Sequence, residues 1–248
     1  MNINQMVIYG TRSIIEAIES SEEISKVYLL KSNSQLNSLT KTLVKLLEIN
    51  NIKFSFVPKE KFKKYGNKNH QGAIALLSPI SILSIEELIR TTFKEKKLQN
   101  YLLLDGITDT RNFGAIIRTA VATDISGIII GQNNSAPVNS DVVKTSSGSV
   151  FKIPIARVNN LKDAIIYLNS IGIEIISLSE KGNNTIYDYS FNKSVGIILG
   201  SESKGISKSI INMSSETLKV PISKNIDSLN VSVAFSALIF EIIRQRKF

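Results

Sequence analysis

Polar side chains gather in three loops of the C-terminal half of the chain, each directly after an apolar run. YLLLD (101–105) is followed by GITDTRNFG, VGIILG (195–200) by SESKGIS, and TLKVPI (217–222) by SKNIDSLN. Open α/β sheets bind ligands just beyond the C-termini of their strands. Three polar loops at equivalent positions therefore indicate one shared site.

The composition limits the chemistry that this site can perform. The chain has no cysteine and one histidine, His70, which excludes disulfides, thiolate nucleophiles and Cys/His zinc sites and leaves at most one candidate for a Ser-His-Asp arrangement. No GxxxxGK[ST] loop occurs, and GSESKG (200–205) lacks the GxGxxG spacing, so a P-loop nucleotidase or a dinucleotide-binding Rossmann fold has little support. Carboxylates, hydroxyls, amides and Arg/Lys remain.

Three polar residues stand in contexts that do not favour them. Glu202 lies in a glycine-bounded turn after a buried strand, where a carboxylate needs partners such as helix N–H groups or an arginine. Arg118 lies within AIIRTA, and Asn230 opens an apolar helix. Taken singly, Arg118 and Asn230 are each more often a structural cap or a snorkelling side chain than a catalyst, and GSESKG alone is compatible with a tight turn before a helix over 206–213.

Uniformly apolar strands are expected to position the three loops. Such strands are buried on both faces, as in parallel α/β sheets. They are predicted at 101–105, 127–131, 152–158, 173–179, 195–200 and 217–222. A C-terminal helix is predicted over 227–246, capped by Asp227 or Ser228.

The first hundred residues form a separate pattern. Helices are predicted at 11–20 and 36–49, and strands at 26–31, 53–57 and 73–77. Residues 78–100 supply Pro and Ser breakers and the charged amphipathic stretch IEELIRTTFKEKK. We therefore expect a small α/β domain over 1–79, a linker with a helix over 80–99, and a second α/β domain over 100–248.

The net charge favours a polyanionic partner. It is +9, with a pI of about 9.6, and residues 1–98 hold 15 Lys+Arg against 9 Asp+Glu. The segment PKEKFKKYGNKNHQG (58–72) is the most basic stretch, and its lysines are predicted to contact nucleic-acid phosphates, the alternative being a solvated face. These candidates are Lys59, Lys61, Lys63, Lys64 and Lys68. Apolar runs are far shorter than the roughly 20 residues of a membrane span, so no membrane association and a cytoplasmic location are expected.

Taken together, the three loops resemble a known family. N-F-G-x-x-x-R (112–118), G-S-E-S-K-G-I (200–206) and V-P-I…S-L-N-V-S-V (220–233) are similar to the three motifs of the SpoU/TrmH branch of SPOUT methyltransferases, in that order. IYGTRSIIEAIES (8–20) and HQGAIAL (70–76) resemble the N-terminal RNA-binding domain of bacterial ribose methyltransferases that modify a guanosine in 23S rRNA. The resemblance thus covers the whole chain.

The resemblance implies a fold, a cofactor and an assembly. The fold is α/β: a C-terminal α/β-knot domain with a deep trefoil knot and a mostly parallel sheet, preceded by a small α/β RNA-binding domain. The cofactor is S-adenosylmethionine, bound bent in the knot and held largely by backbone groups, and no metal is required. The cofactor positions carried over from the family are Leu199, Gly200, Val220, Ile222 and Leu229.

The assembly that the resemblance implies is a homodimer with the active site near its interface. The surplus of apolar residues around the C-terminal helix fits this expectation; they are Val231, Val233, Phe235, Ile239, Phe240 and Ile243.

The implied reaction is methyl transfer to a ribose 2′-hydroxyl of rRNA. Asn112 and Arg118 would project toward the reacting atoms. Glu202, Ser228 and Asn230 would close the site. We interpret Arg118 as binding a substrate phosphate and stabilising the developing alkoxide, with Glu202 fixing Arg118 or relaying a proton, because an arginine stays protonated. One position departs from the family pattern: Thr110 stands where a proline, which would stiffen the loop, is common.

Two alternatives remain open. One is a catalytically silent RNA-binding or ribosome-assembly module of the same fold, which would be expected to lose Asn112, Arg118 or Glu202; all three are present. The other is a 2′-O-methyltransferase that acts on tRNA, or on rRNA to confer antibiotic resistance. The N-terminal domain makes tRNA the less favoured target, since tRNA ribose enzymes of this branch usually lack it.

Overall fold

The computed structural model describes residues 5–31, 35–63, 65, 69–94 and 97–247. The chain divides into two compact units. The N-terminal unit comprises Met1–Ile80 and Val138–Lys152, and the C-terminal unit comprises Ser81–Pro137 and Ile153–Phe248. Residues 138–152 therefore follow the first strands of the C-terminal unit in sequence but pack within the N-terminal unit.

The N-terminal unit is built on a four-stranded sheet in the order β1-β4-β2-β3. β4 pairs antiparallel with both β1 and β2, whereas β2 and β3 are parallel. The strands are β1 (Met6–Tyr9), β2 (Ile24–Leu30), β3 (Phe54–Val57) and β4 (Ala73–Leu77). Strands at 26–31, 53–57 and 73–77 were thus predicted to within two residues at each end, and β1 was not predicted.

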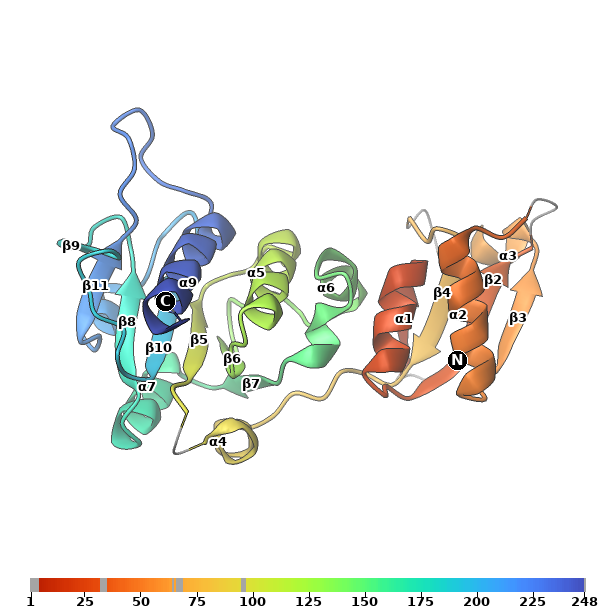
Figure 1. The fold of residues 1–248 in the computed structure, drawn as a ribbon, viewed down its shortest axis with the longest axis horizontal. Helices are drawn as coiled ribbons and strands as arrows, with labels where there is room; N and C mark the ends of the chain where they lie inside the picture. Colours follow the sequence, from red (N-terminus) through yellow and green to blue (C-terminus); the bar gives the residue numbers. More distant parts are fainter. Residues whose placement is uncertain (1–4, 32–34, 64, 66–68, 95–96, 248) are drawn as a thin grey trace. The chain divides into compact units, whose positions relative to one another are not determined.

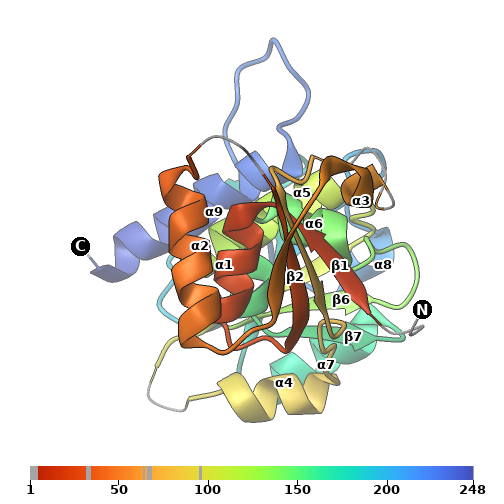
Figure 2. The ribbon, with the colours of Figure 1, turned by 90° about the vertical axis from the view of Figure 1, so that its right-hand side faces the viewer.

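Helices α1 (Thr11–Glu19) and α2 (Ser38–Ile49) lie together on one side of this sheet (Figure 2). Their apolar residues recur at helical spacing and face the buried side chains of Val27 and Leu29. The short helix α3 (Lys59–Lys63) packs on the opposite face, where Phe62 joins a small apolar cluster.

Residues 138–152 complete the N-terminal unit with α6 (Ser140–Thr145) and a 3-10 turn (Ser149–Lys152). α6 lies against β1, and Gly148 passes so close to α1 that a Cβ there would be 2.4 Å from the Cβ of Glu16. Glu16 is buried and forms ion pairs with Lys152 and, at 2.5 Å, with Arg12. Burial raises the pKa of Glu16, but the hydrogen bonds and charges of Lys152 and Arg12 outweigh it and leave that pKa below its ordinary value.

The C-terminal unit is built on a seven-stranded sheet in the order β7-β6-β5-β10-β8-β11-β9, and every pair in it is parallel. β10 is inserted between β5 and β8, two strands that precede it in the chain, and β11 is inserted between β8 and β9 (Figure 1). The strands are β5 (Asn100–Asp105), β6 (Gly127–Gly131), β7 (Ile155–Val158), β8 (Glu174–Leu178), β9 (Asn184–Thr185), β10 (Val195–Gly200) and β11 (Glu216–Lys219). The central strands are buried on both faces, as the apolar runs predicted.

Helices α4 (Ile85–Thr92), α5 (Thr110–Ala122), α7 (Leu161–Ser170), α8 (Lys208–Ile211) and α9 (Val231–Lys247) belong to the same unit. Two predicted strands are shorter than expected because prolines limit them: β7 starts after Pro154, and β11 stops before Pro221. The predicted helix after residue 84 ends at Thr92, where Phe93 takes an extended conformation. Within the described residues, no helix is long and apolar enough to cross a membrane.

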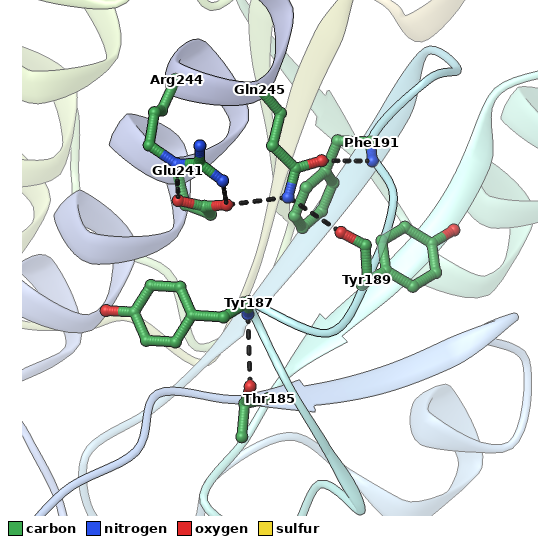
Figure 3. Close-up of polar contacts among 7 residues, drawn as sticks. All are labelled: Thr185, Tyr187, Tyr189, Phe191, Glu241, Arg244 and Gln245. Atoms are coloured by element: carbon green, nitrogen blue, oxygen red, sulfur yellow. Dashed lines mark hydrogen bonds and ion pairs between the residues drawn. The ribbon is translucent and has the colours of Figure 1, made fainter.

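A polar network fastens the end of α9 to the chain that leads into β10 (Figure 3). Glu241 accepts hydrogen bonds from the guanidinium of Arg244, twice at 2.8 Å, and from Gln245 Nε2 at 2.8 Å. Gln245 also donates to the carbonyl of Tyr189 and accepts from the N–H of Phe191. The hydrogen bonds from Arg244 and then Gln245 lower the pKa of the buried Glu241 to about 2.

Candidate active site

The loops after β5, β10 and β11 leave the same edge of the sheet, because these strands are parallel and close neighbours. Side-chain hydrogen bonds join the three loops directly. Asn230 Nδ2 donates to Asn112 Oδ1 at 3.0 Å and to Glu202 Oε1 at 2.5 Å. Three residues from three different motifs thus form one cluster.

Asn230 is oriented by its place at the start of α9. Its side-chain Oδ1 accepts hydrogen bonds from the N–H and the hydroxyl of Ser232, at 3.0 and 2.6 Å. Asn230 therefore caps the helix, and the prediction that Asp227 or Ser228 does so was wrong. Because Oδ1 is used by the cap, the amide must turn Nδ2 toward Asn112 and Glu202. This explains why an amide begins an apolar helix.

Glu202 is positioned by a tight return of the chain after β10. Ser201 and Gly205 form a bridge, with the N–H of Gly205 donating to the carbonyl of Ser201 at 2.8 Å. Gly200 permits this return, since a Cβ there would lie 2.2 Å from the carbonyl carbon of Gly205. Asp105, at the end of β5, accepts a hydrogen bond from the N–H of Ser207 at 2.8 Å and ties the turn to the neighbouring strand.

Asn112 is held by the first turn of α5. Asp109 caps this helix by accepting from the N–H groups of Arg111 and Asn112, at 2.6 and 3.0 Å. The hydrogen bonds from Asn112 and then Arg111 lower the pKa of Asp109. Thr110 is the first residue of α5, the helix position at which proline is best tolerated. The aspartate cap therefore fixes the first turn of α5 without a proline at this position.

Two adjoining cavities lie at this edge, and the turn of residues 201–205 forms the wall between them. The first, of about 280 Å³, is lined by all five predicted cofactor positions together with Glu202 and Ser228. The second, of about 610 Å³, is lined by polar groups that include Asp105, Asp109, Asn112, Asn133 and Asn134, and also by Glu202. Glu202 lines both cavities, so its carboxylate is accessible from either side of the turn.

Arg118 does not join this cluster within its own chain. It follows Asn112 by six residues on α5, which places it roughly 120° away around the helix. Its side chain is exposed and lines neither cavity, and within the described part of the chain it makes no hydrogen bond or ion pair. Glu202 contacts Asn230 here, where the sequence interpretation had it fix Arg118.

Some lining residues were not selected from the sequence. Asn133 and Asn134 follow β6, and Ser179, Glu180 and Lys181 follow β8. Both groups are polar loops after apolar strands, so the rule that selected the first three loops would have found them as well.

The predicted RNA-binding lysines belong to the N-terminal unit. Lys59, Lys61 and Lys63 lie on α3, and all three are exposed. Lys64 and Lys68 fall outside the described residues.

The C-terminal unit thus combines a parallel sheet with two cavities that share the turn of residues 201–205. Residues 99–240 match the SpoU rRNA Methylase family, and residues 7–83 match the domain described as RNA 2'-O ribose methyltransferase substrate binding. The chain belongs to the SpoU rRNA methylase family, which confirms the resemblance of its three motifs.

Similar proteins agree with this assignment. A Staphylococcus saprophyticus protein assigned to the TrmH family of tRNA/rRNA methyltransferases is 30% identical, over 99% of this chain and 98% of its own. The SpoU methyltransferase AviRb from Streptomyces viridochromogenes, solved with AdoMet, superposes with a TM-score of 0.80 at 22% identity, covering 98% of this chain and 91% of that one. An AdoMet-bound rRNA methyltransferase from Sinorhizobium meliloti gives 0.80 at 21% identity, covering 99% and 89%. The predicted fold class, an α/β-knot domain preceded by a small α/β domain, is confirmed by these likenesses.

Proposed function

We propose that this protein transfers a methyl group from S-adenosylmethionine to a ribose 2′-hydroxyl of RNA, with a guanosine of 23S rRNA as the target. The observation that carries the proposal is the wall of residues 201–205, which places Glu202 between two cavities and against Asn112 and Asn230. The family match and the substrate-binding domain match supply the class of reaction and of substrate.

The first cavity suits S-adenosylmethionine. Its lining combines apolar side chains with the backbone of turns, as at Leu199, Val220 and Leu229, and Gly200 leaves backbone exposed there with no side chain. Two relatives of the same fold were solved with AdoMet. The bound cofactor would supply an electrophilic methyl group on a sulfonium, so this chain has only to place the acceptor and remove its proton.

The second cavity would hold the acceptor nucleotide. When the 2′-oxygen forms its bond to the methyl carbon, the carbon–sulfur bond breaks and the hydroxyl proton must leave. Glu202 is the carboxylate on the dividing wall; its Oε1 is held by Asn230, and its Oε2 is available to relay that proton. Asn112 uses its Oδ1 for Asn230, so its Nδ2 hydrogens are available to orient the acceptor.

We propose a homodimer as the working form. α5 and α9 lie side by side (Figure 1), and α9 exposes Val233 (52%) and Phe240 (58%) while Phe235 and Ile239 are buried. This apolar surplus favours a partner surface. In such a dimer, Arg118 of one copy would serve the site of the other, where it binds a phosphate of the substrate.

The dimer is tested by sedimentation of Phe240→Glu. It should be monomeric at micromolar concentration, whereas Ile166→Glu, a matched change at an isoleucine on α7 that is 60% exposed, should remain dimeric. A monomeric wild-type protein would refute the dimer. Mixing inactive Arg118→Ala and Glu202→Gln chains should partly restore activity if each site uses the partner's arginine.

The reaction is tested by mapping ribose methylation in 23S rRNA and in tRNA from cells with and without the protein. A single 2′-O-methylguanosine that disappears from 23S rRNA supports the proposal. Disappearance of a tRNA mark would assign the enzyme to tRNA, and unchanged marks in both RNAs would favour the catalytically silent module.

The basic helix α3 is tested through salt dependence. Lys59→Gln with Lys63→Gln should reduce the slope of log affinity against log salt by about one for each phosphate that the variant no longer binds. The control pair is Lys41→Gln with Lys45→Gln, two exposed lysines on α2, which should leave the slope unchanged.

A further inference from the structure

The sheet of the N-terminal unit has one face that its long helices do not cover. Along β2, Val27 and Leu29 are buried beneath α1 and α2, so Lys26, Tyr28 and Leu30 project from the opposite face. On that face Tyr28 packs against the small cluster around Phe62 but stays half-buried. α3 lies at one end of this face (Figure 2).

Two ammonium groups converge on the ring of Tyr28. Lys61 Nζ lies 4.7 Å and Lys26 Nζ 5.3 Å from its centroid. A second ring, that of Tyr65, lies 6.3 Å away at an angle of 37°. Throughout the described residues, neither ammonium forms an ion pair with a carboxylate, and the hydroxyl of Tyr28 has no hydrogen-bond partner.

These features fit a ligand better than a purely structural role. Two like charges at one ring repel each other unless an anion joins them. A tyrosine that only filled the core would be buried and would have a partner for its hydroxyl. An aromatic ring beside unpaired cations matches what an unpaired nucleotide offers, a flat base next to a phosphate.

We propose that Tyr28, supported by Tyr65, is a stacking platform for an unpaired RNA base, with Lys26 and Lys61 binding the flanking phosphates. The proposal rests on the proposed RNA substrate and adds that the N-terminal unit reads a single-stranded segment. Bases within a duplex are already stacked and do not expose their faces to such a ring.

An RNA base can replace a lysine ammonium on the ring of Tyr28, because base stacking contributes more binding affinity than an exposed cation–π contact does. An exposed cation–π contact is worth about two- to fivefold in affinity, whereas stacking of one base on an aromatic side chain is worth roughly five- to 150-fold. The displaced ammonium then gains a phosphate within reach of its flexible stem.

Fluorescence can detect this stacking directly, since the natural chain contains no tryptophan. Tyr28→Trp should show saturable quenching on titration with a short single-stranded oligo(A). An abasic strand of the same length, and duplex RNA, should produce no comparable quenching. The matched control is Phe56→Trp on β3, a site 43% exposed in register with Leu29 and so on the opposite face, which should not be quenched.

The affinity for single-stranded RNA distinguishes a stacking role of Tyr28 from a packing role. Tyr28→Leu keeps an apolar side chain against the cluster and should weaken binding of the single strand about tenfold, while Tyr28→Phe keeps the ring and should bind like the wild type. The salt slope should be the same in both variants because the lysines remain. Equal affinity of the Leu and Phe variants, or equal quenching at positions 28 and 56, would overturn the proposal.

The methylation assay distinguishes failure of the stacking platform from failure of the proposed function. A wild-type protein that methylates RNA while Tyr28→Leu binds the single strand normally would refute the platform alone. A wild-type protein that methylates no RNA would refute the proposed function, whatever the binding data show.

Discussion

Gly200→Ala tests whether the turn after β10 builds the site. A Cβ at residue 200 would lie 2.2 Å from the carbonyl carbon of Gly205 and 2.3 Å from the nitrogen of Ile206. Ordinary Cβ contacts begin at 3.4 Å, so the backbone facing Gly200 must move by 3.4 less 2.2, about 1.2 Å. Both clashing atoms are backbone, and no side-chain rotation can relieve the overlap.

This displacement falls on the wall that carries Glu202 and separates the two cavities. Misplacement of a reacting group by about 1 Å lowers a rate by roughly 10²-fold. We therefore expect Gly200→Ala to reduce single-turnover methylation by about that factor and to weaken S-adenosylmethionine binding at least tenfold. Overpacking of about 1–3 kcal/mol should lower the melting temperature by roughly 2–12 °C.

Gly196→Ala on the same strand is the matched control. Its Cβ would meet the side-chain tips of Ile175, at 2.7 Å, and Leu103, at 3.3 Å, which can rotate away. This variant should be less stable but should bind the cofactor within about twofold of wild type, because its site is undisturbed. For both variants, cofactor binding is measured by calorimetric titration, the rate by single-turnover methylation and the stability by thermal unfolding. A Gly200→Ala enzyme with wild-type binding and rate would refute the reasoning.

Three further predictions concern single side chains. Asn230→Ser should keep the melting temperature near that of wild type, since serine caps helices equally well, but should slow methylation at least tenfold because the bridge to Glu202 is removed; a normal rate would make Asn230 only a cap. Arg118→Ala should change the unfolding free energy by no more than about 0.5 kcal/mol, lower the methylation rate roughly 10²–10³-fold, and not be rescued by lysine; a destabilised variant with poor cofactor binding would indicate a structural arginine. The pKa of Glu241 is about 2 in the folded protein and ordinarily 4.5, so its stabilising effect is complete above about pH 4.5 and is lost as the pH falls toward 2. Denaturant unfolding across that range should therefore show a shallower loss of stability with acid in Glu241→Gln, and an equal loss in both proteins would contradict the role given to Arg244.

Local patterns in the sequence predicted most of the elements and supplied the candidate residues of the site. The apolar runs at 101–105 and 195–200 predicted strands buried on both faces, as β5 and β10 are, and the polar loops after them were predicted to lie at a ligand-binding edge. Glu202 and Asn230 could be selected because each stands where its side chain needs a partner, whereas Asn112 was selected from the motif N-F-G-x-x-x-R. These inferences need only the identity of neighbouring residues.

The tertiary structure decided which elements lie beside which. Nothing in the periodicity of β10 shows that it enters between β5 and β8, because strand pairing depends on fit between distant apolar faces. The same holds for residues 138–152, whose place in the N-terminal unit depends on Gly148 fitting against Glu16.

The directions in which the site's side chains point could not be predicted from the sequence either. Asn112 and Arg118 share one motif, yet only Asn112 lines a cavity, since α5 begins at Thr110 and its helical phase points the two residues to different sides. α9 starts one residue after Asn230, and the Oδ1 of Asn230 caps this helix by accepting a hydrogen bond from the N–H of Ser232. The Nδ2 of the same amide therefore points toward Glu202. The sequence determines which groups are available, and the start of each helix in the folded chain determines which of them meet.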